Sequence, residues 1–431
     1  MIRKRFYFYF MQKPSLFDKA FRVLLILLPF TTLITVYTKE KLGIPGIGFY
    51  KELLLFFMLA YIAYMHIIKK IKLSFSWFDW LLISYITIMV IISLFTTGIK
   101  WVIYWWRYAF EFLIAFWILY HGKVFLEKPI SYYIKLFLYS CGAMLFISWL
   151  LKWPLTEDIL LYFWYCGNPS NWQSCNWVPP IFHGVDWANV RRFQWILDGP
   201  NTMGGILIIF SWFLAYFIRW KKDWYFPVWI VMIGLFWMLF YTYSRSALIG
   251  IIFWIILIVW NNLLFLFRKY MKEFIISSIF IGIIWGILFY TYSDALISRW
   301  WSNKWHFERM QIWVQRFIEY PLGQWLWSSW PGYRHTIPNI WKNIQKEETF
   351  YIPESWYIQQ FVEWWIIWGL LFICIMAWLF IQTWKKSIFI WGALWWILIM
   401  NFFLHTFESS VLSLILFTLL GILLSPKEQV K

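Results

Sequence analysis

Long apolar runs recur along the whole chain and are separated by short polar segments. At a rise of about 1.5 Å per residue, helices formed by these runs can cross a hydrocarbon layer of about 30 Å. The pattern predicts an all-α integral membrane protein. Twelve spans are expected, near residues 21–38, 47–68, 74–97, 103–121, 131–151, 200–218, 225–243, 247–267, 274–293, 356–381, 387–404 and 409–425.

Two polar connections, roughly 152–199 and 294–355, are much longer than the others. Insertions of this length within a compact protein are usually functional or disordered. In the second connection, residues 305–309 are followed by an apolar spacing through Ile312, Phe317 and Tyr320. This spacing predicts an amphipathic helix lying near the membrane interface.

Lysines and arginines gather at alternate junctions between the predicted spans, as the positive-inside rule requires. The rule places both termini in the cytoplasm and both long connections outside. The basic N-terminus followed by an apolar segment resembles a signal peptide, but no small-residue cleavage site follows, so a retained first span is expected. The clusters are Arg3 to Lys19, Lys69 to Lys72, Lys123 and Lys128, Arg219 to Lys222, Arg268 to Lys272, Lys385 and Lys386, and Lys427 and Lys431.

Composition supports a membrane protein, because 62% of the 431 residues are apolar and 14% are charged. A soluble domain has about 25% charged residues. The net charge of +17 is explained by the basic clusters, so no nucleic-acid partner is expected. Eight residues separate Cys166 from Cys175 in the first long connection. These two cysteines pair if that connection faces an oxidising compartment, and otherwise both are free thiols.

Several arginines fall on the predicted outer side, against the positive-inside rule. A guanidinium is a planar fork that matches phosphate oxygens, so a cluster there would suit a lipid carrying a pyrophosphate. Alternatively, each arginine reaches lipid headgroups or pairs with Asp186, Asp198 or Asp294. The arginines concerned are Arg191, Arg192, Arg245, Arg309 and Arg334.

Four motifs accompany these arginines, in order along the chain. The segment from Arg192 to Asn201 ends in Asp-Gly-Pro-Asn, which includes Pro200, and opens a span. Ser244-Arg245 begins a later span, Gly323 lies in the second long connection, and Glu354 and Glu363 flank the start of another span. With this order and spacing, residues 185–425 resemble the O-antigen ligase and polymerase family of integral membrane glycosyltransferases. That family carries Arg-x-x-Gly-x-Phe-x-x-Pro-Asn, Ser-Arg, Gly-x-Gly, His-Asn-x-Tyr-Leu and Glu-x-Gly-x-x-Gly.

The resemblance implies a metal-independent, inverting transfer at the outer face of the inner membrane. The donor would be a glycan linked to undecaprenyl pyrophosphate, and the acceptor a sugar hydroxyl on a glycan or a lipid-linked glycan. By position, Arg192 and Arg245 match the arginines that hold the donor pyrophosphate, and we expect Arg309 and Arg334 to assist. Residues 185–425 would be the catalytic region, following N-terminal spans at 1–184 and preceding a cytoplasmic tail at 426–431. No cofactor is expected, since the sequence has no His and Cys cluster at metal-ligand spacing.

The family most often has a histidine as general base where this chain has Glu354. A carboxylate with a raised pKa can accept a proton from a sugar hydroxyl, so Glu354 is the first candidate, with His335 and then His306 as competitors. Alternatively, Glu354 only caps the following helix. Glu363 is expected to make a buried polar contact. Arg107 and Glu111, four residues apart, are expected to form a structural ion pair.

The chain has 38 tryptophans and only 20 glycines. Several tryptophans, among them Trp195, Trp325, Trp365 and Trp368, fall where the family pattern has glycine or next to such a site. Glycine at turns and close helix crossings is there because nothing larger fits. Because some bacteria read UGA as glycine, our hypothesis is that many printed tryptophans are native glycines. The alternative is a protein that is truly rich in tryptophan and stacks aromatic faces on sugar rings.

Two other functions remain open on sequence alone. A transporter or flippase for lipid-linked oligosaccharide would also need arginines for pyrophosphate, but in a cavity open to both sides. A membrane scaffold would leave Arg192, Arg245 and Glu354 far apart. The sequence does not separate ligase from polymerase, since both share the donor and the chemistry.

Overall fold

The computed structural model describes most of the helical part of the chain. The described residues are 15–68, 73–96, 110–153, 155, 157–167, 179–181, 183–185, 188–194, 196–218, 225–253, 300–319, 355–403, 407 and 409–425.

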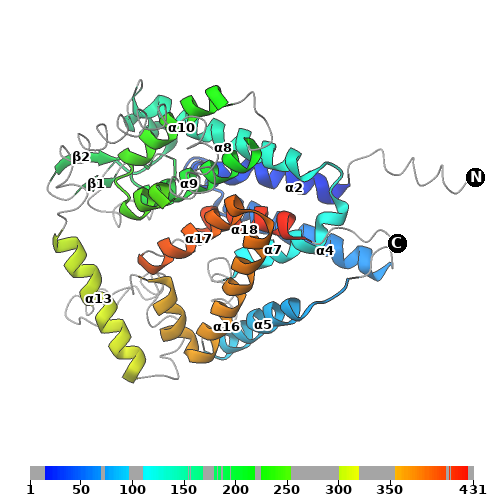
Figure 1. The fold of residues 1–431 in the computed structure, drawn as a ribbon. Coiled ribbons are helices and arrows are strands. Elements are labelled where there is room, and N and C mark those ends of the chain that lie inside the picture. The colour runs from blue at the N-terminus through cyan, green and yellow to red at the C-terminus, as the bar shows by residue number, and fades with distance from the viewer. Residues whose placement is uncertain are drawn as a thin grey trace, which may run out of the picture.

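The described N-terminal part consists of helices (Figure 1). Ser15 caps the first helix, because its hydroxyl accepts a hydrogen bond from the backbone N–H of Asp18 at 3.0 Å. Pro29 lies where this helix passes through a 3-10 turn into the next one. The elements are α2 (Leu16–Leu27), η1 (Leu28–Phe30), α3 (Thr31–Glu40), η2 (Pro45–Phe49), α4 (Tyr50–Ile67), α5 (Trp77–Thr96), α7 (Glu111–Gly122), η3 (Lys123–Phe125) and α8 (Ile130–Lys152).

The C-terminal part adds a short antiparallel hairpin and more helices. A further helix begins at residue 245 and continues to residue 253, where the described stretch ends. The named elements are η4 (Glu157–Phe163), β1 (His183–Val185), β2 (Ala188–Arg192), α9 (Pro200–Ile218), α10 (Tyr225–Tyr241), α13 (Trp300–Glu319), α16 (Trp356–Lys386), α17 (Ile388–Phe403) and α18 (Ser410–Leu424).

Five helical segments in the described residues are long and apolar enough to cross a membrane: Leu16–Glu40, Ile47–Ile67, Ile130–Lys152, Pro200–Ile218 and Trp368–Lys386. Three shorter apolar helices, Trp77–Ile91, Ile388–Phe402 and Ser410–Leu424, also coincide with predicted spans. The protein is therefore an all-α membrane protein in its main features. The predicted span 274–293 lies outside the described residues, and the total of twelve stays a prediction.

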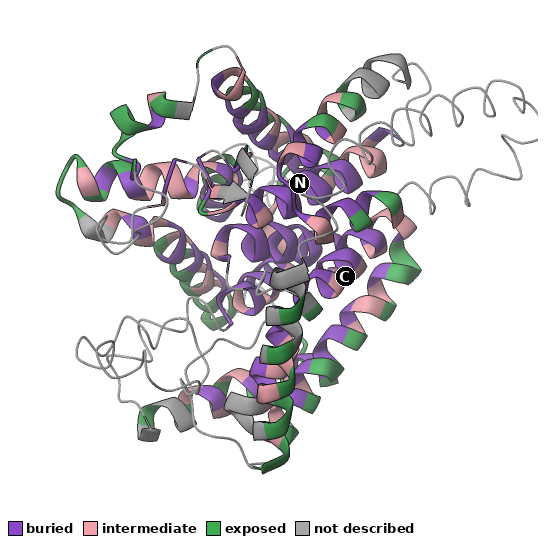
Figure 2. Ribbon diagram, turned by 90° about the vertical axis from the view of Figure 1, so that its left-hand side faces the viewer, coloured by how far each residue is buried: buried purple, intermediate pink, exposed green. Residues whose placement is uncertain are grey.

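Helix α18 lies at the centre of the bundle and packs most extensively against α7. A Cβ atom added at Gly421 would lie 2.7 Å from the carbonyl oxygen of Phe116, so only glycine permits this close crossing. Buried residues gather in the middle of the bundle (Figure 2). Large apolar side chains such as Phe56 and Ile67 are exposed on the periphery, as expected for a surface that faces lipid.

The helix ends form two groups, as the predicted alternation requires. In one group, Lys123 after α7 donates to the carbonyl of Ser425 after α18 at 3.3 Å, and the N–H of Ser15 donates to Glu127 at 2.7 Å. In the other group, the N–H of Phe407 before α18 donates to Asn401 near the end of α17 at 3.2 Å. The described contacts thus agree with the predicted topology. Which group faces the cytoplasm stays a prediction.

The two long connections are more structured than their polar composition indicates. The first contains the β1–β2 hairpin, which the sequence analysis did not predict. Cys166 in this connection is disulfide-bonded, whereas Cys141 and Cys374 are free; the predicted partner, Cys175, lies outside the described residues. In the second connection, the predicted helix is confirmed as α13, which packs against α16 through the rings of Phe317 and Phe361.

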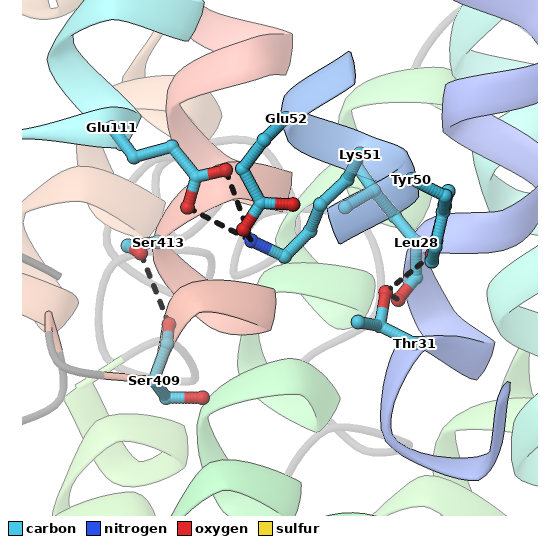
Figure 3. A network of polar contacts seen from close by, with 8 residues as sticks. All are labelled: Leu28, Thr31, Tyr50, Lys51, Glu52, Glu111, Ser409 and Ser413. Atoms are coloured by element: carbon cyan, nitrogen blue, oxygen red, sulfur yellow. Dashed lines mark hydrogen bonds and ion pairs between the residues drawn. The ribbon is translucent and has the colours of Figure 1, made fainter. Parts of the chain in front are cut away.

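A buried ionic cluster joins α4 to α7 (Figure 3). The Nζ of Lys51 lies 2.9 Å from both carboxylate oxygens of Glu111 and 2.7 Å from Glu52. The sequence predicts Arg107 as the partner of Glu111, but Arg107 lies outside the described residues. The described partner of Glu111 is Lys51, whose side chain is completely buried.

Candidate functional site

The β1–β2 hairpin places Arg192 beside the beginning of α9. The hairpin register pairs His183 with Arg192 and Gly184 with Arg191. After β2, the backbone N–H of Phe193 donates to the carbonyl of Tyr241 at 2.7 Å, which ties the strand to the end of α10. A short turn then leads to Pro200, which pre-sets the backbone for the first turn of α9. Arg192 therefore lies where a hairpin, α9 and the end of α10 meet.

The guanidinium of Arg192 bridges two of the predicted motifs. Its Nε donates to the carbonyl of Thr242 at 2.9 Å, and one terminal nitrogen donates to Asn201 Oδ1 at 3.1 Å. The same nitrogen lies 3.4 Å from the carbonyl of Tyr243. These contacts bring the Arg192 segment, Asn201 and the turn before Arg245 together.

The turn at residues 242–244 delivers Arg245 to the start of a helix. Tyr243 adopts a φ of 49°, in the left-handed region that costs a residue with a side chain about 1–3 kcal/mol. The N–H of Ser244 donates to the Thr242 hydroxyl at 3.2 Å, and Arg192 holds the carbonyls of Thr242 and Tyr243. Arg245 follows as the first helical residue and is half-buried.

Close packing fixes α9 against the helix that begins at Arg245. A Cβ atom added at Gly204 would lie 2.7 Å from the Cβ of Ala247 and 3.3 Å from that of Ser244. No larger residue fits at this crossing without a shift of the helices. The predicted motif residues Asn201 and Ser244 are thereby held at neighbouring helix ends.

The beginning of α16 belongs to the same end of the bundle. The Ser355 hydroxyl donates to the carbonyl of Asn401 at 3.4 Å, and Asn401 in turn accepts from the N–H of Phe407 ahead of α18. Leu412 near the start of α18 lies against Gly205 near the start of α9. The segment that follows Glu354 is therefore on the same side as Arg192.

His183 and Gln194 form a polar pair within the hairpin region. The Nδ1 of His183 is hydrogen-bonded to Oε1 of Gln194, and Nε2 of Gln194 donates to the carbonyl of Pro180 at 2.6 Å. Burial lowers the pKa of His183 and nearby Arg192 lowers it further, although the Gln194 hydrogen bond acts in the opposite direction. Burial and Arg192 therefore favour the neutral form of His183.

Asp198 and Tyr165 interact near the turn between β2 and α9. Desolvation by surrounding protein raises the pKa of Asp198 even though part of the residue is exposed, and hydrogen bonds from Thr202 and the local backbone oppose the rise. The Tyr165 hydroxyl donates to the carbonyl of Ile196 at 2.7 Å, and burial raises its pKa well above the ordinary value. The contact from Tyr165 holds the turn between β2 and α9.

The other predicted site residues are not brought into this arrangement by the described structure. Arg309 lies on α13 and Glu363 on α16, where the structure does not describe their side chains. Arg191 pairs with Asp158 at 3.4 Å, and both are exposed, so this pair is a surface contact. Residues outside the described part of the chain are Gly323, Arg334, His335 and Glu354.

His183 and Gln194 are not among the site residues predicted from the sequence. The signal that could have found His183 is its cross-strand pairing with Arg192. This pairing becomes apparent only once residues 183–192 are recognised as a hairpin. Among the described residues, no group of three or more His, Cys, Asp or Glu side chains could hold a metal ion.

Comparison with known proteins identifies no relative: no family model, no curated protein and no solved structure matches the chain.

Proposed function

We propose that the protein is a membrane glycosyltransferase of the O-antigen ligase or polymerase type. It would transfer a glycan from an undecaprenyl-pyrophosphate carrier to a sugar hydroxyl at the outer face of the cell membrane. The membrane-spanning helices supply the lipid-facing surface that such a donor requires. Donor and acceptor glycans and membrane lipids would then be its partners.

One observation carries the proposal: Arg192 contacts both Asn201 and the turn that leads to Arg245. Arg192 and the turn before the second motif lie 50 residues apart in the sequence, and nothing in a generic bundle requires the two motifs to meet. The resemblance groups these same residues as the donor site, so their convergence supports it. The disulfide at Cys166 supports an oxidising environment for the first long connection.

The proposed chemistry follows from the charge of the two arginines. Transfer to the acceptor breaks the bond between the anomeric carbon and the phosphate, so negative charge develops on the pyrophosphate. Fixed guanidinium groups stabilise that charge in the transition state. Hydrogen bonds from Arg192 to backbone carbonyls orient the group and leave its formal charge unchanged.

Glycan analysis of cells carrying Arg245→Ala tests the proposal. We expect loss of polymerised or attached glycan, with the lipid-linked donor accumulating at the outer face. Donor that instead accumulates at the inner face would support a flippase and overturn the transferase. Unchanged glycan length and attachment in cells carrying Arg245→Ala would overturn the proposed function.

A further inference from the structure

We infer that His183 is the general base of the proposed transfer, in place of Glu354 or His335. The inference rests on the proposed function, because it assigns the acceptor side of the same site. It is carried by the contacts of His183 with Gln194 and by its place opposite Arg192 in the hairpin.

The hydrogen bonds around Gln194 determine which nitrogen of His183 carries the proton. Gln194 is buried, and its amide N–H₂ group donates to the carbonyl of Pro180 at 2.6 Å. The amide oxygen is therefore the atom that faces Nδ1 of His183, and an oxygen of this kind only accepts. Nδ1 must carry the hydrogen, which leaves Nε2 of the neutral ring with its lone pair.

In this tautomer Nε2 can accept a proton, as a general base must. A base must lie near the reacting group and be unprotonated at the working pH. The guanidinium of Arg192 disfavours a second positive charge on His183, and so does burial. Among the described residues, Arg192 is the charged side chain that acts electrostatically on His183. Gln194 holds the ring in place, and its neutral amide oxygen favours the imidazolium less than a carboxylate would.

The hairpin register also places His183 beside the donor site. Residues directly opposite each other in an antiparallel pair project their side chains from the same face, with Cβ atoms about 4.5–5.5 Å apart. His183 is opposite Arg192. A donor pyrophosphate held by Arg192 would thus have the histidine within reach of an acceptor hydroxyl.

The step balances as follows. The acceptor oxygen forms a bond to the anomeric carbon, and its proton passes to Nε2 of His183. The bond between the anomeric carbon and the phosphate oxygen breaks, and the pyrophosphate leaves with the electron pair. The imidazolium then returns its proton to water.

The test measures transfer by the purified full-length protein over a range of pH. The donor is the undecaprenyl-pyrophosphate-linked glycan fraction extracted from cells that lack the protein. His183→Ala should lower the rate about 100-fold or more, since a general base contributes about 10²–10⁴-fold. His66→Ala is the matched control, because His66 lies in the last turn of α4 at the opposite end of the bundle, and it should keep the wild-type rate.

Gln194→Glu separates a base from a structural histidine. A carboxylate at position 194 stabilises the imidazolium and raises the pKa of His183, so the acidic limb of the rate profile should move to higher pH. A limb that does not move overturns the inference, even if His183→Ala is inactive through misfolding.

Measuring Arg245→Ala in the same assay distinguishes a failure of the base assignment from a failure of the proposed function. If Arg245→Ala abolishes transfer and His183→Ala retains it, the base lies elsewhere and the transferase stands. If both variants transfer at the wild-type rate, the proposed function fails together with the base.

Discussion

Two cationic sites in this protein are built in opposite ways. Lys51, buried between α4 and α7, lies against the carboxylates of Glu52 and Glu111. Arg192, where β2, α9 and the end of α10 meet, gives its described hydrogen bonds to two backbone carbonyls and the amide oxygen of Asn201. Carboxylates compensate a charge, whereas carbonyls only orient it. The buried cluster joins α4 to α7 and supports the bundle, whereas under the proposed function Arg192 binds the donor.

Breaking the buried cluster should have the largest effect. Lys51→Met leaves the carboxylates of Glu52 and Glu111 buried without their lysine, which costs about 3–5 kcal/mol in buried pairs of this kind. We expect little folded protein when detergent extracts are examined by size-exclusion chromatography. Lys39→Met is the control, because Lys39 pairs with Glu40 at an exposed position and should change stability by less than about 1 kcal/mol. Equal yields for both variants would contradict a structural role for Lys51.

Removing the planar fork at Arg192 should affect activity more than stability. Arg192→Lys keeps the charge but cannot reach Thr242, Asn201 and Tyr243 together. We expect transfer to fall about 100-fold, as when one preorganised donor is removed, while the protein still extracts as a folded monodisperse species. Full activity in Arg192→Lys would show that the fork geometry is unimportant.

The close crossing of α9 with the helix that begins at Arg245 holds the segments around Arg192 in place. Gly204→Ala would push a methyl group to 2.7 Å from Ala247 and should cost about 1–3 kcal/mol in thermal unfolding experiments. Gly234→Ala in α10 is the matched control. No atom lies within 4 Å of an added Cβ there, so the variant should be neutral or more stable by up to about 1 kcal/mol. Equal melting temperatures would mean that the crossing does not need glycine.

The tryptophans affect the packing of the helix bundle rather than the chemistry of the site. The indole nitrogens of Trp368, Trp391 and Trp396 are buried and have no hydrogen-bond partner among the described residues, although buried tryptophans usually find one. A Cβ at Gly250 would lie 2.0 Å from the ring of Trp396. Native glycine at several printed tryptophans would explain these orphaned groups. Reading the gene decides: UGA codons at Trp195, Trp325, Trp327 and Trp368 support recoding, and UGG codons at these positions exclude it.

The helices were largely predictable because membrane spans have a strong signal. The predicted span 200–218 coincides with α9 (Pro200–Ile218), and 131–151 lies within α8 (Ile130–Lys152). Apolar length alone fixes such elements. The hairpin was not predictable in the same way, since β1 and β2 are short and lie in a polar segment without a clear alternation.

The site was predictable only where the motifs contact the same turn, at residues 242–244. Arg192, Arg245 and Glu354 were expected to converge, and the structure brings Arg192 into contact with the turn before Arg245, while Glu354 lies outside the described residues. His183 was missed because its role depends on cross-strand pairing and on the orientation of the Gln194 amide. Lys51 was missed because a lysine inside an apolar run gives no sign of which helix supplies its partner.

Binding of undecaprenyl pyrophosphate to the purified protein tests the central claim, that Arg192 and Arg245 form a pyrophosphate site. Native mass spectrometry can compare this lipid with undecaprenyl monophosphate on the wild type, Arg245→Ala and the Lys39→Met control. The account predicts that Arg245→Ala weakens binding of the pyrophosphate lipid at least about tenfold, a loss of about 1.4 kcal/mol, while Lys39→Met does not. Equal binding of both lipids by all three proteins would contradict it.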